Sequence, residues 1–189
     1  MVIGRDIFAE GIIVAIDADN LLITSAKKGV EFKNYDLMAG FEKMFSWMDF
    51  GKIICVNVYL PSWQIYSKND LWHDLWQKYR KEFPFKYVYC PKKKPANRWE
   101  KKDNVDAHLI ADTKELVKLY ARQAKYFCLA SGDKDYSPLV WDLKRENDIQ
   151  IAFAVGSEDS FSNTYRQAKT IAKHPVTGLE LVHYFSPHK

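Results

Sequence analysis

Short apolar segments alternate with segments of helical periodicity along this chain, and that alternation allows only a few folds. The first apolar segment, residues 11–16, is continuous, as in a strand that is covered on both faces. Further strand-like segments lie at residues 52–60, 85–90, 126–130 and 149–155. Strands that alternate with helices predict a mostly parallel, five-stranded sheet with helices on both faces, which is a three-layer α/β/α sandwich.

Helices are expected between these strands because apolar residues recur there at helical spacing. Residues 71–79 carry apolar side chains at i, i+1, i+4, i+5 and i+8, with Asn69 or Asp70 as the cap. The other expected helices lie at residues 35–47, from 103 or 104 to 120, 137–146 and 157–172. The tail beyond Pro175 either adds a strand or packs as an extension.

The composition is that of one folded domain. The chain has 189 residues and contains no linker, repeat or low-complexity segment, so we expect a single domain with residues 173–189 as a C-terminal extension. Hydrophobic residues make up 47% of the chain, which excludes a disordered protein. The apolar run at residues 12–16 is far shorter than the roughly 20 residues of a membrane span, and no signal-peptide pattern precedes it. A soluble, cytoplasmic protein is expected, with no membrane partner.

The chain has three cysteines. Cys55, Cys90 and Cys128 each lie in an expected strand without metal-binding spacing, so we interpret them as buried, reduced thiols.

The net charge of +4 is modest, but cations crowd the loop at residues 91–102, which also holds Trp99. These cations are Lys92, Lys93, Lys94, Arg98, Lys101 and Lys102. The loop is either a solvated surface or a contact for a nucleic acid strand, with Trp99 able to stack on an unpaired base.

Carboxylates occur in three groups near the ends of expected strands. The groups are Asp17 and Asp19 after the first strand, Asp103 and Asp106 after the third, and Asp133 and Asp135 after the fourth. In the strand order 3-2-1-4-5 all three groups face one crevice, at the point where the strand order reverses. Carboxylates so close repel one another unless a cation offsets their charge, and oxygen ligands without paired His or Cys favour Mg²⁺ or Mn²⁺. Such an ion can polarise a phosphodiester and lower the pKa of an attacking water.

Not every acid is expected to bind the ion. Asp17 could simply form a turn, but we favour a site because other carboxylates converge on it. Asp19 is expected to cap the following segment. Asp112 lies roughly 240° around its helix from Asp106, so it is expected either behind the metal-binding acids or at the surface.

Three motifs, in this order and spacing, resemble those of the NYN domain family, LabA-like branch, within the PIN-like nuclease superfamily. They are residues 16–21 (IDADNL), Asn104-Val105-Asp106 with Leu109 and Asp112, and residues 129–140 (LASGDKDYSPLV). The resemblance covers residues 12–168. It implies a PIN-like α/β/α sandwich with a metal-dependent ribonuclease site.

Carried over residue by residue, the resemblance implies four catalytic, metal-binding acids: Asp17, Asp106, Asp133 and Asp135. The same motif favours Asp106 as a site acid over a first-turn helix acid that complements the dipole. Asn20 would orient a ligand or an acid of the site. Asn20 and Ser131 are both expected to bind the substrate.

Two positions depart from the family pattern. Lys134 lies between the last two acids, where the family often has a small residue, and it could contact phosphate or weaken metal binding. Asp103 stands where a lysine is expected, next to Lys102. On the RNA side we expect Lys134 together with Arg98, Trp99, Lys101 and Lys102.

The leading hypothesis is a metal-dependent ribonuclease that acts on single-stranded RNA, and the state of assembly, including a homo-oligomer, is left open. One alternative is an RNA-binding or regulatory module with little nuclease activity. Another is a haloacid-dehalogenase-like phosphatase, because Asp17-Ala18-Asp19 also resembles the nucleophile and acid/base pair of that family. The phosphatase pattern needs a second later acid where Ser137 stands, which counts against it.

Overall fold

The computed structural model describes residues 11–26, 34–47, 52–61, 71–91, 104–147, 149–156, 158–165 and 182–184. Its centre is a six-stranded sheet in the order β3-β2-β1-β4-β5-β6, in which all neighbouring strands are parallel. The strands are β1 (Gly11–Asp17), β2 (Lys52–Pro61), β3 (Phe85–Cys90), β4 (Ala124–Ala130), β5 (Gln150–Val155) and β6 (Val182–Tyr184). The predicted order of the first five strands is confirmed, and the tail adds β6 beside β5.

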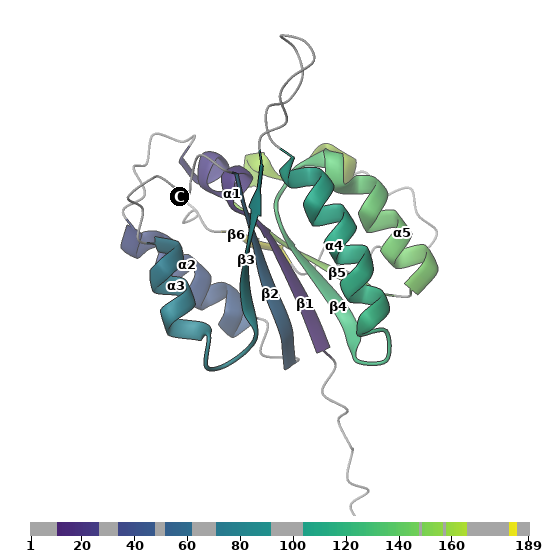
Figure 1. Ribbon diagram of the computed structural model, residues 1–189. Helices are drawn as coiled ribbons and strands as arrows, with labels where there is room; N and C mark the ends of the chain where they lie inside the picture. The colour runs from purple at the N-terminus through teal and green to yellow at the C-terminus, as the bar shows by residue number, and fades with distance from the viewer. Residues whose placement is uncertain are drawn as a thin grey trace, which may run out of the picture.

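Helices cover both faces of the sheet (Figure 1). They are α1 (Ala18–Ala26), α2 (Asn34–Trp47), α3 (Leu71–Tyr79), α4 (Val105–Leu119) and α5 (Ser137–Asn147), with short 3-10 turns η2 (Lys134–Tyr136) and η3 (Glu158–Ser160). Helices α2 and α3 lie on one side, and α4 and α5 lie on the other (Figure 1). None of the helices in the described ranges is long and apolar enough to cross a membrane.

Strand β1 separates two hydrophobic cores. Its residues are all buried, which explains why the run is apolar without alternation. Ile12, Val14 and Ile16 pack with residues of α2 and α3, whereas Ile13 and Ala15 pack with residues of α4 and α5. Asp17 continues the second set by the two-residue period of a strand, so its side chain belongs to the α4 side of the sheet.

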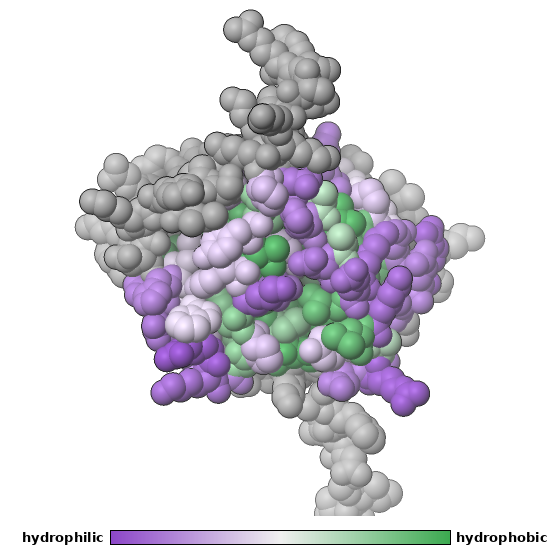
Figure 2. All heavy atoms as spheres, viewed as in Figure 1, coloured by the Kyte–Doolittle hydropathy of each residue, from purple (hydrophilic) through white to green (hydrophobic). Residues whose placement is uncertain are grey.

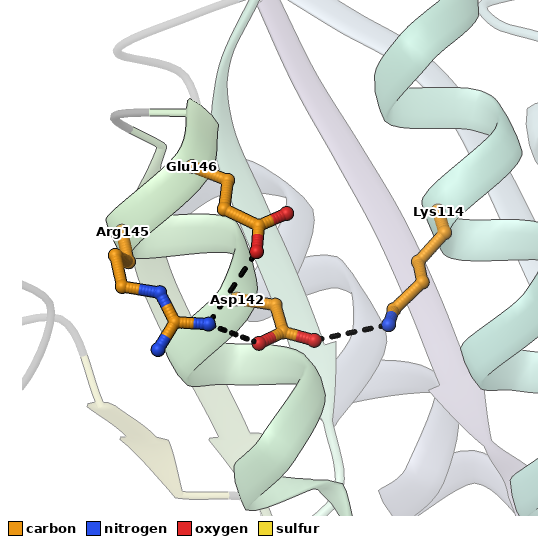
Figure 3. Close-up of polar contacts among 4 residues, drawn as sticks. All are labelled: Lys114, Asp142, Arg145 and Glu146. Carbon is orange, nitrogen blue, oxygen red and sulfur yellow. Dashed lines mark hydrogen bonds and ion pairs between the residues drawn. The ribbon is translucent and has the colours of Figure 1, made fainter.

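Hydrophilic side chains cover the outer surfaces of the helices. Figure 2 shows hydrophilic residues over α3 and over α4 and α5, with hydrophobic residues visible between them above the sheet. Helices α4 and α5 are also joined by charged side chains (Figure 3). The Asp142 carboxylate accepts from Lys114 Nζ and from Arg145, each at 3.0 Å, and Arg145 also reaches Glu146 at 3.4 Å. These groups are solvent-exposed to varying degrees, so each pair contributes no more than about 1 kcal/mol.

Two sequence predictions about helices differ from the structure. Helix α1 begins directly at the end of β1, where no helix was expected. The helix expected over residues 157–172 begins later than predicted: η3 ends at Ser160, and helical residues start at 163 and run to 165, the last residue described there. Phe161 and Tyr165 there pack against Phe153 of β5, with ring centroids 5.0 and 4.7 Å away, so this segment is held against the edge of the sheet. Residues 166–172 lie outside the described residues.

The three cysteines behave as predicted. Cys55, Cys90 and Cys128 are buried and free. Burial raises the pKa of Cys55 to about 11 and that of Cys128 to about 12, so both remain protonated thiols at neutral pH.

Candidate active site

The hydroxyl of Tyr136 joins three separate parts of the chain at the carboxyl end of the sheet. Its oxygen lies 2.8 Å from Asp17 Oδ2, at the end of β1, and 2.9 Å from Asp106 Oδ1, in the first turn of α4. Tyr136 is completely buried, Asp17 is 4% exposed and Asp106 is half-buried. Two acids that are distant in sequence are therefore brought to one hydroxyl.

Asp17 has this position because it ends a strand and begins a helix at once. The backbone N–H of Asn20 donates to Asp17 Oδ1 at 3.1 Å, which is the geometry of an N-cap for α1. The capping role expected of Asp19 thus belongs to Asp17, since α1 starts at Ala18 and leaves Asp19 inside the first turn. The cap fixes one carboxylate oxygen of Asp17 and leaves the other directed at Tyr136.

Burial dominates the electrostatics of the site. It raises the pKa of Asp17 to about 7, and the nearby charges of Asp106 and Asp19 add to this, while the hydrogen bonds from Asn20 and Tyr136 oppose it. Burial and then the two aspartate charges raise the pKa of the Tyr136 hydroxyl above its ordinary value. A neutral hydroxyl has one hydrogen, so it cannot donate to both carboxylates at once. A proton on one acid would supply the second hydrogen, and a cation beside the pair would offset the like charge.

The turn after β4 is built from its own polar groups. The Asp133 N–H donates to Ser131 Oγ at 3.2 Å, and the Asp135 N–H donates to Asp133 Oδ1 at 3.0 Å, so Asp133 caps η2. Ser131 is completely buried, which places its hydroxyl inside the turn rather than at a surface. The side chain of Asn20 accepts from the Gly132 N–H at 3.3 Å and thereby links α1 to this turn.

A second segment holds the same turn from the other side. The Ser162 N–H donates to the Gly132 carbonyl at 3.1 Å, and the Tyr165 hydroxyl donates to the Asp133 carbonyl at 2.7 Å. A Cβ on Gly132 would lie 2.1 Å from the Ser160 carbonyl oxygen, so only glycine allows this close approach. The position of Tyr136, which follows immediately, is therefore well determined.

The four predicted acids differ in how the structure places them. Asp17 and Asp106 contact the same oxygen, whereas Asp133 is half-buried with one oxygen bonded to the Asp135 N–H, and Asp135 is exposed. Lys134, between the last two, is exposed as well. Within the described part of the chain, no group of three or more His, Cys, Asp or Glu side chains is placed so that it could hold a metal ion.

A two-carboxylate set still fits a hard cation. Mg²⁺ commonly takes one or two carboxylates and completes its shell with water and substrate phosphate. Asp17, which is buried, and Asp106, which is half-buried, form a like-charge pair whose charge such an ion would offset. The pair fits the expected metal by number and chemistry of its donors.

Tyr136 was given no role in the sequence-based prediction. It lies within the motif at residues 129–140, directly after Asp135, and a buried tyrosine hydroxyl usually finds a partner. That rule offers a signal, although it does not say which partner. The predicted RNA-side residues Arg98, Trp99, Lys101 and Lys102 lie outside the described residues.

Asp112 has a different partner from Asp106. Its Oδ2 lies 3.4 Å from the hydroxyl of Tyr59, which is completely buried and also lies 3.3 Å from Asn57 Nδ2. Helix α4 thus presents two aspartates to two different buried tyrosines.

Comparison with known proteins supports this assignment of fold and family. A crystal structure of a protein of unknown function from Vibrio parahaemolyticus is similar with a TM-score of 0.62 and 16% sequence identity, over 85% of this chain and 89% of that chain. At this identity the likeness speaks for the fold alone. No curated protein sequence matches the chain. Residues 11–172 match the NYN domain, a nuclease-type domain, and the chain therefore belongs to the NYN domain family.

Proposed function

We propose that this protein is a metal-dependent ribonuclease, of the LabA-like branch of the PIN-like nucleases, that hydrolyses RNA phosphodiester bonds at Asp17 and Asp106. One observation carries the proposal: two acids from β1 and α4 converge on one buried hydroxyl at the carboxyl end of a parallel sheet. This is where open α/β sheets bind their ligands. Membership of a nuclease-type family supports the same conclusion.

Asp17 and Asp106 would hold Mg²⁺ or Mn²⁺, with Asp133 and Asp135 contributing from the neighbouring turn. When bound, the ion supplies an activated water and offsets the charge of the phosphodiester. The protein's own residues keep the acids in place: the Asn20 N–H caps Asp17, and the Asn20 side chain bonds the turn that carries Asp133. The buried side of the site excludes water from behind the acids.

RNA is the proposed partner, and single strands are preferred. Lys134 is exposed beside the two turn acids, so its ammonium can meet a phosphate as the strand approaches. Arg98, Trp99, Lys101 and Lys102 remain the proposed strand-binding residues, with Trp99 stacking on a base. Ser131 Oγ accepts from the Asp133 N–H and so supports the turn. Its proposed effect on the substrate is indirect, through the position of this turn. The proposed location is the cytoplasm.

The assay that tests this function uses two substrates. Purified full-length protein is incubated with single-stranded RNA and with a small phosphomonoester, each with Mn²⁺ or with EDTA. Cleavage of RNA with Mn²⁺ and its loss in EDTA are expected. Hydrolysis of the monoester alone would replace the nuclease by the phosphatase alternative.

The second candidate is an RNA-binding module that cleaves poorly. It is favoured by one observation, that the described residues bring only two acids together at Tyr136 and contain no larger metal-binding group. Tight RNA binding without cleavage at any Mn²⁺ concentration would select it.

A further inference from the structure

Tyr136 contacts both acids from the buried side of the site. We infer that Tyr136 is a positioning residue, whose hydroxyl orients the carboxylates of Asp17 and Asp106 toward a divalent cation on their solvent side. The inference rests on the proposed metal-dependent function. It adds to that function a residue that the sequence analysis left without a role. It follows from the contacts, the exposure of the side chains and the anchoring of the ring.

Exposure increases outward from the hydroxyl. Tyr136 is 0% exposed and Asp17 is 4% exposed, whereas Asp106 and Asp133 are half-buried and Asp135 is exposed. The site therefore opens on the side away from Tyr136. A hydrated cation and an RNA phosphate would approach from the more exposed side, where the hydroxyl does not block them.

The ring of Tyr136 cannot leave this position easily. It is the last residue of η2, which Asp133 caps, and α5 begins at the next residue. It also packs in the same buried cluster as Leu139 and Val140, the first buried residues of α5. The hydroxyl is thus set in place by the turn and the core before any ion arrives.

The contacts assign a definite task to this hydroxyl. Asp17 is bonded at both oxygens, by the Asn20 N–H at 3.1 Å and by the Tyr136 hydroxyl at 2.8 Å, which determines the plane of its carboxylate. The contact of 2.9 Å to Asp106 sets the separation of the second carboxylate from the first. Hydrogen bonds to carboxylates that bind metal typically account for 10–100-fold in metal affinity.

Direct metal binding tests the inference with a matched pair of variants. Mn²⁺ binding to full-length Tyr136→Phe is followed by the electron paramagnetic resonance of free Mn²⁺, with Tyr59→Phe as the control. Both substitutions remove one buried hydroxyl that contacts an aspartate of α4, but Tyr59 contacts Asp112 instead of the paired acids. Circular dichroism and thermal unfolding establish that both variants are folded.

The expected result is a Kd for Mn²⁺ that rises about 10-fold or more in Tyr136→Phe and stays unchanged in Tyr59→Phe. RNA cleavage by Tyr136→Phe should recover at high Mn²⁺, so that the Mn²⁺ concentration for half-maximal rate rises more than kcat falls. An unchanged or tighter Kd in Tyr136→Phe overturns the inference, and so does an equal weakening in both variants.

The same titration separates this inference from the proposed function. If the wild type binds Mn²⁺ but does not cleave RNA, the ribonuclease proposal fails while the affinities of the two variants still decide the role of Tyr136. If the wild type cleaves RNA and both variants bind Mn²⁺ as it does, only the role of Tyr136 fails. A wild type that does not bind Mn²⁺ contradicts both.

Discussion

Helix α4 contacts two buried tyrosines that differ in what surrounds them. Tyr136 lies between two carboxylates, Asp17 and Asp106, at 2.8 and 2.9 Å. Tyr59 lies between one carboxylate, that of Asp112 at 3.4 Å, and the amide of Asn57 at 3.3 Å. Both tyrosines are completely buried, so burial alone does not distinguish them.

The difference lies in charge and in place along the strands. Asn57 lies inside β2, in register with Ala15, and its amide can donate to the Tyr59 oxygen while that hydroxyl donates to Asp112. Both contacts of the Tyr59 oxygen therefore have a hydrogen without any added proton or cation. Asp17 ends β1, and its carboxylate repeats the charge of Asp106 without supplying a hydrogen when ionised. A buried carboxylate with a raised pKa beside a second acid occurs more often at functional sites than elsewhere in proteins.

The largest effect on stability is expected when the charge at the Tyr136 cluster is removed. Asp17→Asn keeps an oxygen that can accept from the Asn20 N–H and supplies an amide that can donate to Tyr136. The folded-state pKa of Asp17, about 7, lies above that of an aspartate in an unfolded chain, so the stability gained from its bound proton is complete below about pH 4 and is lost as pH rises through 7.

Urea unfolding from pH 4 to 8 checks this expectation. The wild type should lose free energy of unfolding relative to Asp17→Asn across that range, by on the order of 2–4 kcal/mol. Asn57→Ala serves as a control because it carries no titrating group and should follow the pH profile of the wild type. Parallel profiles for wild type and Asp17→Asn would show that Asp17 does not carry this charge conflict.

The opposite change adds a carboxylate beside Tyr59, so that this tyrosine, like Tyr136, lies between two acids. Asn57→Asp places a carboxylate at a side chain that is 6% exposed, beside Tyr59 and Asp112. Because no donor remains for the second contact, the free energy of unfolding at pH 8 should fall by about 3 kcal/mol and recover partly at pH 5. Thermal unfolding at the two pH values measures this. A variant as stable as the wild type at pH 8 would remove the distinction drawn between the two tyrosines.

A smaller effect is expected from the turn that determines where Tyr136 lies. Gly132→Ala brings a Cβ into the carbonyl oxygen of Ser160, which is backbone and cannot rotate away. The free energy of unfolding should fall by about 2 kcal/mol, measured by urea unfolding. Lys134→Ala, an exposed change in the same turn, should leave it nearly unchanged. Equal stability of both variants and the wild type would mean that the turn is not tightly held by the segment at residues 158–165.

The alternation of strands and helices follows from periodicity, whereas the order 3-2-1-4-5, which places β1 beside β4, was adopted as the arrangement in which the acid groups meet and as what the PIN-like resemblance implies. The sequence did not predict the bonds to Tyr136, because burial of that hydroxyl depends on how α4 and η2 close over the end of β1. Helix α1 was missed since its apolar residues lie on more than one side: Ala18 and Leu21 are buried together, whereas Ile23 is exposed. The start of the helix expected at residues 157–172 was misplaced: residues 158–160 form η3, helical residues begin at 163, and Phe161 and Tyr165 pack on Phe153.

The central claim is that Asp106 serves a metal-dependent ribonuclease site and Asp112, on the same helix, does not. The most direct test measures the rate of Mn²⁺-dependent cleavage of single-stranded RNA by Asp106→Asn and Asp112→Asn side by side. Loss of a metal ligand should cost more than the 10–100-fold that supporting hydrogen bonds contribute, so we expect a drop of about 100-fold or more in Asp106→Asn. Asp112→Asn should stay within about two-fold of the wild type, since its carboxylate contacts only Tyr59 among the bonds described for it. Equal rates for Asp106→Asn and the wild type would contradict the account.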